Sequence, residues 1–267
     1  MAASRSPLIN VMVRAAEKAA RTLVRDFGEV EQLQVSKKGP ADFVSSADIA
    51  AERAIRAELS KARPDFAFLM EESGETGPKE ARNRWIVDPL DGTTNFLHGL
   101  PHWAISIGAE IDGAITAGVI YDPVKDELFW AERGQGAFVN SKRLRVSGRR
   151  TLETAMVATG MPYKGRETGK HYLAELDLVM QEVAGVRRFG SAALDLAYVA
   201  AGRYDAFWEY GLSPWDTAAG AILVAEAGGF VMEIDGGNNP VFGKSVLAAN
   251  GPLQRPMFDL LKRARSG

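Results

Sequence analysis

A stretch from Trp85 to Phe96, which reads W-I-V-D-P-L-D-G-T-T-N-F, constrains the fold of this chain more than any other. Its first three residues are apolar and favour β-structure, so we expect a short buried strand there. Asp88 and Asp91 follow, on either side of a proline and directly before a glycine. The chain is expected to leave the strand, turn and present two carboxylates close together. Like charges at that spacing need a cation.

The residues after these two aspartates have the composition of a helix start. Gly92, Thr93 and Thr94 supply a tight turn, hydroxyl groups for capping and the free backbone N–H groups of a first helical turn. Such N–H groups bind phosphate, and paired carboxylates bind hard cations. The stretch as a whole indicates metal-assisted chemistry on a phosphate ester.

Composition and charge narrow the class of protein. The chain has 267 residues and 46% hydrophobic content, which suits one large globular domain or two packed lobes. Its net charge of -2 gives no general reason to expect nucleic acid or an anionic membrane as a partner. The absence of cysteine and the presence of three histidines argue against disulfides and against thiolate or imidazole metal sites. No segment approaches the apolar length of a membrane span, so the cytoplasm is the expected compartment.

Periodicity predicts helices and an antiparallel meander in the first half of the chain. Apolar residues three and four apart indicate helices over 7–27 and 47–62. A compact apolar strand is expected over 66–70, followed by a polar loop over 73–84. Alternating apolar and polar residues with regularly spaced turn residues indicate an antiparallel meander. Its strands are expected near 104–111, 114–121 and 127–131.

Helices and strands alternate in the second half, which implies layered packing of helices on a sheet. The expected strands lie near 155–159, 185–189, 204–208, 230–234 and 245–249. The expected helices lie near 169–182, 191–201, 215–227 and 252–265. We therefore expect an α+β chain with an N-terminal lobe over 1–150 and a C-terminal lobe over 151–267.

Two basic stretches each have two interpretations. Residues 32–40 mix β-branched, basic and helix-breaking residues, and we interpret them as a strand or a mobile hairpin that carries Lys37 and Lys38. Adjacent lysines usually belong to solvated surface, and the alternative is a cationic flap over a phosphate site. The run from Lys142 to Arg150 is expected to be a solvated edge or loop, with a binding surface as the alternative.

Four carboxylates that are far apart in the sequence stand at the edges of predicted elements. They are Glu71, Asp88, Asp91 and Asp216. Taken alone, Glu71 is an exposed loop acid and Asp216 is a helix cap. If all four converge, their hard oxygen atoms would hold two or three Mg²⁺ ions. One ion would lower the pKa of a bound water and another would stabilise the leaving oxygen.

Asp48 and Thr93 would complete this chemistry. Asp48 lies in the first turn of the helix predicted over 47–62, where capping and the helix dipole alone would explain it. Together with Thr93, it would relay the proton from the attacking water. The backbone N–H groups of Gly92 and Thr93 would hold the phosphate oxygens.

Several segments resemble the motifs of one enzyme family. W-I-V-D-P-L-D-G-T-T-N-F and W-D-T-A-A-G-A-I-L-V-A-E-A-G-G are similar to the two signature segments of the inositol monophosphatase family, and M-E-E-S is similar to its third acidic motif. The similarity covers nearly the whole chain and is greatest to bacterial members. It implies a layered α-β-α-β-α fold and a Mg²⁺-dependent phosphatase that acts on inositol 1-phosphate or a similar small polyol phosphate. It also implies a homodimer and inhibition by Li⁺.

The resemblance assigns metal-binding roles to individual residues. Glu71, Asp88 and the backbone carbonyl of Leu90 would ligate a first Mg²⁺. Asp88, Asp91 and Asp216 would hold a second, and Glu71 would assist a looser third. The resemblance also places Glu71, Leu90, Asp91 and Asp216 among the substrate-binding residues, and Glu71 among the catalytic ones.

The resemblance likewise assigns the substrate side of the site. The phosphate-binding segment corresponds to Asp91, Gly92 and Thr93, and the water-activating pair to Thr93 and Asp48. A turn that lines the substrate corresponds to Gly190, Ser191 and Ala192. Glu209 matches the residue that accepts hydrogen bonds from inositol hydroxyls, and Lys37 falls where members carry a flap lysine.

The chain departs from the family pattern at two places, and the substrate stays open. Met70 stands where many members have Gly, and Ser213-Pro214 replaces the His-Cys of animal enzymes. Relatives of the same fold hydrolyse histidinol phosphate, fructose 1,6-bisphosphate or adenosine 3',5'-bisphosphate, and these are alternative substrates. A role of a different class would be binding to transcription machinery in addition to catalysis, for which the run from Lys142 to Arg150 is the candidate surface.

Overall fold

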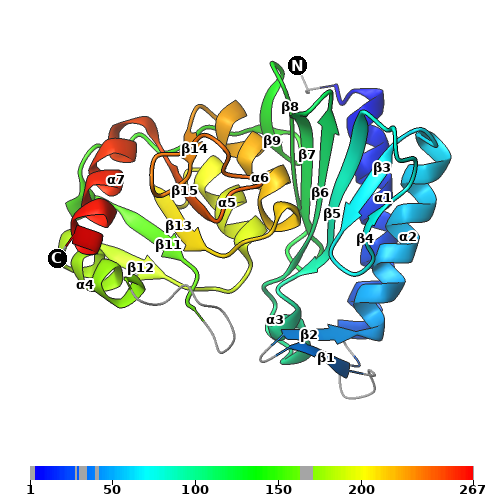
Figure 1. Cartoon of the computed structure of the whole chain (residues 1–267), viewed down its shortest axis with the longest axis horizontal. Helices are drawn as coiled ribbons and strands as arrows, with labels where there is room; N and C mark the ends of the chain where they lie inside the picture. The colour runs from blue at the N-terminus through cyan, green and yellow to red at the C-terminus, as the bar shows by residue number, and fades with distance from the viewer. Residues whose placement is uncertain (1–3, 28, 30–34, 40–41, 163–170, 267) are drawn as a thin grey trace.

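Two β-sheets alternate with three pairs of helices in this computed structural model (Figure 1). The structure describes residues 4–27, 29, 35–39, 42–162 and 171–266, with the backbone alone at 35–39, 42–44 and 266. The helix pairs, in layer order, are α1 (Pro7–Phe27) with α2 (Ser46–Ala62), α5 (Ala192–Ala200) with α6 (Pro214–Glu226), and α4 (Tyr172–Glu182) with α7 (Gly251–Ser266). The layered α-β-α-β-α architecture predicted from the sequence is confirmed.

The first layer, α1 and α2, covers one face of an eight-stranded sheet. An apolar stripe on α1 buries side chains such as Ile9, Met12 and Leu23 against that sheet. Both helices match the predicted ranges to within one residue. Burial of this stripe accounts for the position of α1, because each fully buried aliphatic side chain contributes about 1.5–3 kcal/mol.

The hairpin before α2 bears on the prediction for residues 32–40. Strand β1 (Val35–Gly39) pairs antiparallel with β2 (Asp42–Ser45), so the strand interpretation is confirmed over 35–39. Strand β2 lies beyond the predicted segment and was not predicted. The hairpin tip at 40–41 and the side chain of Lys37 lie outside the described residues.

The eight-stranded sheet contains the predicted antiparallel meander. Its strands are, in spatial order, β10 (Lys142–Arg143), β9 (Gly136–Val139), β8 (Glu127–Glu132), β7 (Ala114–Asp122), β6 (Ala104–Ile111), β5 (Asn83–Asp91), β3 (Ala67–Met70) and β4 (Gly74–Thr76). The prediction of a loop over 73–84 was wrong, because that segment contains β4 and the start of β5. Gly74 adopts a φ of 66° and pairs with Met70, which closes the β3–β4 hairpin.

Strand β5 does not end at Val87 as the sequence predicted. It continues to Asp91, and its register against β6 shifts between Asp88 and Asp91. Pro89 lies in this irregular segment, where a residue without a backbone N–H is tolerated since the ladder is already interrupted. The two aspartates are therefore presented by an irregular strand end, and the turn follows at Gly92.

The second sheet has five strands and mixed direction. Its strands are, in spatial order, β12 (Gly185–Arg187), β11 (Met156–Thr159), β13 (Ala206–Tyr210), β15 (Ser245–Ala249) and β14 (Phe230–Met232). Helices α5 and α6 fill the space between the two sheets with an alanine-rich core, and α4 and α7 cover the outer face (Figure 1). The short elements that remain are α3 (Thr93–Leu97) and a 3₁₀ turn at Leu152–Thr154.

The basic run from Lys142 to Arg150 follows the outer edge of the first sheet. All five of its Lys and Arg side chains are exposed, which confirms the prediction of a solvated edge. The run is anchored through Ser147, whose hydroxyl donates to the buried carboxylate of Asp205. Asp205 also accepts a hydrogen bond from the backbone N–H of Met156 at 2.7 Å, and β13 begins only after it, at Ala206. Among the described residues, no helix has the length and apolar character needed to cross a membrane.

Candidate active site

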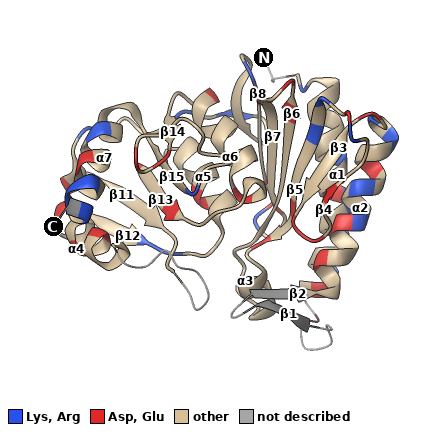
Figure 2. Ribbon diagram, viewed as in Figure 1, with Lys and Arg blue, Asp and Glu red and all other residues tan. Residues whose placement is uncertain are grey.

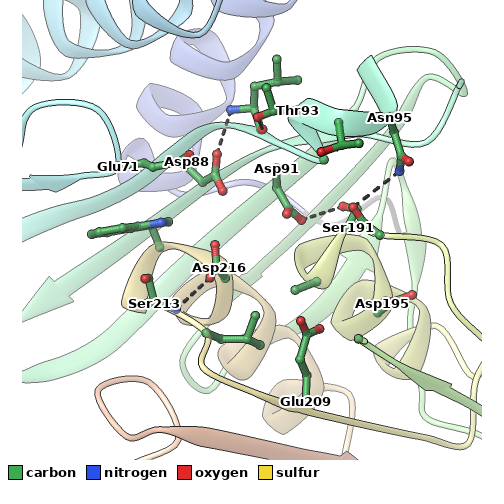
Figure 3. Close-up of a pocket in the computed structure, with 18 of the residues that line it drawn as sticks. Glu71, Asp88, Asp91, Thr93, Asn95, Ser191, Asp195, Glu209, Ser213 and Asp216 are labelled. Carbon is green, nitrogen blue, oxygen red and sulfur yellow. Dashed lines mark hydrogen bonds between the residues drawn. The ribbon is translucent and has the colours of Figure 1, made fainter. Parts of the chain in front are cut away.

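A cleft of about 350 Å³ opens between the end of β5 and the helix starts of α5 and α6 (Figure 3). Nearly all of the predicted site residues line it: Glu71, Asp88, Leu90, Asp91, Gly92, Thr93, Gly190, Ser191, Ala192, Glu209 and Asp216. Asp48 is fully buried behind Thr93. Figure 2 shows acidic residues, in red, on both β5 and β13, and these two strands belong to different sheets. The cleft is therefore strongly acidic.

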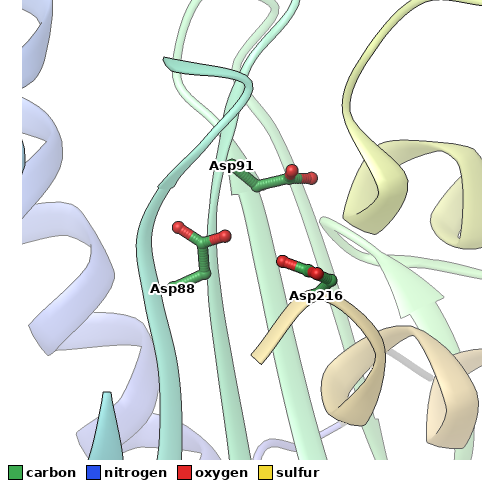
Figure 4. Close-up of side chains that lie close together, drawn as sticks. All are labelled: Asp88, Asp91 and Asp216. Carbon is green, nitrogen blue, oxygen red and sulfur yellow. The ribbon is translucent and has the colours of Figure 1, made fainter. Parts of the chain in front are cut away.

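Asp88, Asp91 and Asp216 converge in this cleft (Figure 4). One carboxylate oxygen of each lies within 4.8 Å of the others. Asp88 and Asp91 come from β5, whereas Asp216 comes from the first turn of α6. Carboxylates from two elements more than a hundred residues apart in sequence thus form one oxygen cluster.

Asp216 is both a helix cap and a member of the cluster. Its Oδ2 accepts a hydrogen bond from the backbone N–H of Ser213 at 2.7 Å. Pro214 occupies the first turn of α6, where a missing N–H costs nothing. Because the cap fixes the side chain at the helix start, the capping interpretation and the site interpretation describe the same geometry.

Asp88 and Asp91 are held by hydrogen bonds that orient their oxygens. Asp88 Oδ1 accepts from the backbone N–H of Leu90 at 2.8 Å. Asp91 Oδ2 accepts from Ser191 Oγ at 2.6 Å and from the backbone N–H of Ala193 at 2.7 Å. Asp91 therefore joins the end of β5 to the start of α5.

The carboxylates raise one another's pKa values. Burial, followed by the charges of Glu71, Asp91 and Asp216, raises the pKa of Asp88 well above its usual value. Burial raises the pKa of Asp91 to about 6, against the opposing hydrogen bonds from Ser191 and Ala193. Carboxylates that repel one another in a buried site are stabilised by a bound cation.

The donor set fits a hard divalent cation. All three clustered ligands offer carboxylate oxygen, which Mg²⁺ and similar ions prefer over nitrogen or sulfur. Glu71 lies beside Asp88 in the same cleft and raises its pKa, although the cluster itself comprises only the three aspartates among the described residues (Figure 3). Leu90 is nearly fully buried between Asp88 and Asp91 and also lines the cleft.

Thr93 and Asp48 form a hydrogen-bonded pair at the edge of the cluster. Thr93 Oγ1 lies 3.1 Å from Asp48 Oδ1 and 3.0 Å from the carbonyl oxygen of Leu90. The other carboxylate oxygen of Asp48 accepts from the backbone N–H of Ser45 at 2.9 Å, which completes a capping box on α2. Burial raises the pKa of Asp48, so this carboxyl group has an increased affinity for a proton.

Gly92 makes the turn between Asp91 and Thr93. Its φ of 98° is in the left-handed region, which residues other than glycine rarely adopt. A Cβ at this position would also lie 3.1 Å from the carbonyl oxygen of His102. The glycine in the motif is therefore required by the backbone.

Ser191 and Glu209 stand on the opposite wall. Ser191 caps α5 through a hydrogen bond from the backbone N–H of Leu194 and also donates to Asp91. Glu209 extends from β13 toward the cleft (Figure 3). The same wall includes Gly190 and Ala192, as predicted.

Three residues that line the cleft were missed by the sequence analysis. Asp195 is 1% exposed, its Oδ1 has no hydrogen-bond partner among the described residues, and burial followed by the charge of Glu209 raises its pKa. Arg188 also lines the cleft. Asn95 Nδ2 donates to the carbonyl oxygens of Phe189 at 2.7 Å and His102 at 2.8 Å, which joins α3 to the opposite wall. The sequence signals were an acidic residue within the otherwise apolar run of α5 and the place of Asn95 in the stretch from Trp85 to Phe96.

Comparisons with known proteins agree with this geometry. The sequence profile of the Inositol monophosphatase family matches residues 4–265. An inositol-1-monophosphatase of Mesorhizobium japonicum is 59% identical over 98% of this chain and 99% of its own length. The Nus factor SuhB of Escherichia coli is 45% identical over 94% of each chain. The crystal structure of the extragenic suppressor protein suhB of Bartonella henselae superposes with a TM-score of 0.94 at 58% identity, over 97% of this chain and 99% of the other.

Proposed function

The chain belongs to the inositol monophosphatase family, and from this premise we propose that it hydrolyses inositol 1-phosphate to inositol and phosphate. The observation that carries the proposal is the convergence of Asp88, Asp91 and Asp216 beside the Gly92 turn. A phosphoric monoester hydrolase of this kind needs a site that attracts divalent cations and a phosphate group together. One cleft contains both the carboxylate cluster for the cations and the Gly92 turn for the phosphate group.

We assign Mg²⁺ to this cleft as the cofactor, with two or three ions. Asp88, Asp91 and Asp216 would hold one ion, and Asp88 with Glu71 and the carbonyl oxygen of Leu90 would hold another. Bound Mg²⁺ supplies positive charge that acidifies a coordinated water and stabilises the departing oxygen. The raised pKa of Asp88 supports this assignment, since burying four acids together is unfavourable without a cation.

The proton of the attacking water has a defined path through side chains. Thr93 Oγ1 accepts this proton while it donates its own to Asp48 Oδ1, 3.1 Å away. The raised pKa of Asp48 favours this transfer. The hydrogen bonds from Ser45 keep the carboxylate of Asp48 facing Thr93 during the transfer.

The remaining residues would bind the two ends of the substrate. Gly92 and Thr93 line the cleft, and their backbone N–H groups would bind the phosphate oxygens. Glu209 would accept hydrogen bonds from hydroxyl groups of the inositol ring, with the turn at Gly190, Ser191 and Ala192 beside it. Lys37 would approach the phosphate from the β1–β2 hairpin.

A panel of phosphate esters tests the substrate assignment. We expect kcat/KM to be highest for inositol 1-phosphate when it is compared with histidinol phosphate, fructose 1,6-bisphosphate and adenosine 3',5'-bisphosphate. A higher kcat/KM for any of the other three would transfer the assignment to that substrate. From the family resemblance we also propose a cytoplasmic homodimer that Li⁺ inhibits, which gel filtration and a Li⁺ titration would test.

A second role, in binding transcription machinery, is favoured by one observation. The exposed run from Lys142 to Arg150 forms a basic edge in a chain that is 45% identical to a Nus factor. Lys142→Glu with Arg143→Glu reverses charge on β10, where both side chains are exposed. We expect these changes to abolish recovery of transcription proteins from cell extract while phosphatase activity persists. Unchanged recovery would remove this role.

A further inference from the structure

Helix α6 brings Asp216 to the sheet that carries Asp88, and Ser106 lies between the two. Ser106 is fully buried on β6, directly opposite Asp88 in the antiparallel ladder. Its Oγ donates a hydrogen bond to the carbonyl oxygen of Trp215 at 3.0 Å. Trp215 immediately precedes Asp216 in the chain. One side chain thus connects the strand pair that positions Asp88 to the backbone that positions Asp216.

Two glycines on the same face of the sheet let α6 approach this closely. Gly108 on β6 and Gly118 on β7 are cross-strand partners. A Cβ on Gly108 would lie 2.9 Å from the Cβ of Ala218, and a Cβ on Gly118 would lie 2.7 Å from the carbonyl oxygen of Ala219. Both distances are shorter than a van der Waals contact of a Cβ atom, so a side chain at either position would push α6 away from the sheet.

We propose that Ser106, Gly108 and Gly118 are positioning residues that set the separation of Asp216 from Asp88 and thereby the affinity for Mg²⁺. The inference rests on the proposed function, because it takes the aspartate cluster as the metal site. None of the three positioning residues lines the cleft, so they act through α6. Residues that orient metal ligands from behind alter metal affinity by about 10–100-fold when they are changed.

Ser106→Ala tests the hydrogen bond with little change in volume. We expect the dissociation constant for Mg²⁺, measured by titration calorimetry on the full chain, to rise about tenfold. Thr116→Ala is the matched control, since Thr116 Oγ1 donates to the carbonyl oxygen of Ala109 at 3.2 Å, a hydrogen bond within the sheet and not to α6. The control is expected to lower Tm and to leave Mg²⁺ affinity unchanged. Equal Mg²⁺ affinity in Ser106→Ala and the wild type would overturn the role of Ser106.

A size exchange across the helix–sheet contact tests the glycines. Gly108→Ala is expected to weaken Mg²⁺ binding about tenfold, and the added change Ala218→Gly is expected to restore it, because it removes the methyl group that clashes. Ala218→Gly alone serves as the control and is expected to bind Mg²⁺ like the wild type. If the double variant bound Mg²⁺ as weakly as Gly108→Ala, the effect would not arise from the spacing of α6.

Mg²⁺ binding by the wild type distinguishes failure of the positioning role from failure of the proposed function. No calorimetric binding of Mg²⁺ by the wild type would refute the metal site itself. Normal binding by the wild type together with normal binding by Ser106→Ala and Gly108→Ala would refute only the positioning role.

Discussion

The contacts within each wall of the cleft and the contacts between the two walls differ in range. On the β5 wall, Asp48 and Ser45 bond across three residues, and Asp88 and Leu90 across two. The wall formed by α5, α6 and β13 has local contacts of its own, such as that of Asp216 with Ser213, whereas the contacts that join it to the first sheet link distant segments. Ser191 reaches Asp91 across 100 residues, and Ser106 reaches the carbonyl of Trp215 across 109. Local contacts therefore orient side chains within each wall, apart from the Thr93–Asp48 pair, which spans 45 residues, and packing of the two sheets around α5 and α6 sets how the walls face each other.

The two walls also carry different parts of the chemistry. The β5 wall carries the proton pair and two of the three clustered carboxylates, which act on the phosphate that every substrate shares. The opposite wall carries Glu209, which would contact the part that differs between substrates. Changes on the β5 wall should therefore slow all substrates alike, and changes at Glu209 should alter the ratio between substrates.

The largest effect is expected for Asp91→Asn. The amide keeps the volume and can still accept from Ser191 Oγ and the N–H of Ala193, but it removes one negative charge from the cluster. We expect kcat to fall on the order of 10³-fold for all phosphate esters with an unchanged circular dichroism spectrum. Activity near that of the wild type at saturating Mg²⁺ would contradict the assignment of phosphate chemistry to the β5 wall.

Thr93→Val is expected to have the next largest effect. Valine has the shape of threonine but lacks the hydroxyl that lies 3.1 Å from Asp48 Oδ1. We expect kcat to fall about 100-fold with little change in KM, the usual size for loss of a proton-transfer group. Thr93→Ser keeps the hydroxyl and should retain most of the activity. If serine and valine were equally impaired, the proton path through Thr93 would be wrong.

The stability of the metal-free protein should depend on pH through Asp91. Burial raises its pKa in the folded chain from 3.8 to about 6. The folded state then holds a proton that the unfolded chain has released, so this contribution to stability is present below pH 3.8 and is lost as the pH rises through about 6. In EDTA at pH 7.5, Asp91→Asn should therefore be more stable than the wild type by about 3 kcal/mol.

Thermal unfolding with and without Mg²⁺ measures that difference. The greater stability of Asp91→Asn should vanish near pH 4, where Asp91 is protonated in the folded wild type. In saturating Mg²⁺ the order of stability should reverse, because only the wild type gains binding energy from the ion. An unchanged order of Tm values at all pH values would mean that Asp91 does not repel its neighbours in the folded state.

The smallest effect is expected on the opposite wall, for Glu209→Gln. We expect kcat/KM for inositol 1-phosphate to fall about tenfold, because a charged acceptor for ring hydroxyls becomes a neutral one. The value for p-nitrophenyl phosphate, which has no ring hydroxyls, should change less than about twofold. An equal loss for both esters would show that the two walls do not divide phosphate chemistry from substrate choice.

The same division explains what the sequence could predict. Asp88, Asp91 and Thr93 belong to one short segment whose composition alone indicates carboxylates followed by a turn. The contributions of Asp195 and Asn95 depend on which residues pack around them, and no local pattern specifies that. Helices with strong apolar periodicity were predicted to within a few residues, since burial of one face decides them.

The strand ends were predicted less well, for a physical reason. Whether β5 stops at Val87 or continues to Asp91 depends on its partner β6, which lies further along the chain. Strand β4 exists because Gly74 can turn back onto β3, a pairing that a polar composition does not reveal. Pairing between strands is a tertiary contact, and alternation within one strand does not specify it.

Anomalous diffraction from crystals grown with Mn²⁺ in place of Mg²⁺ tests the central claim most directly, because it locates the ion without reference to activity. The account predicts an anomalous peak bonded to carboxylate oxygens of both Asp88 and Asp216, so that β5 and α6 share one ion. A peak bound by residues of the β5 wall alone, with Asp216 outside bonding distance, would contradict it.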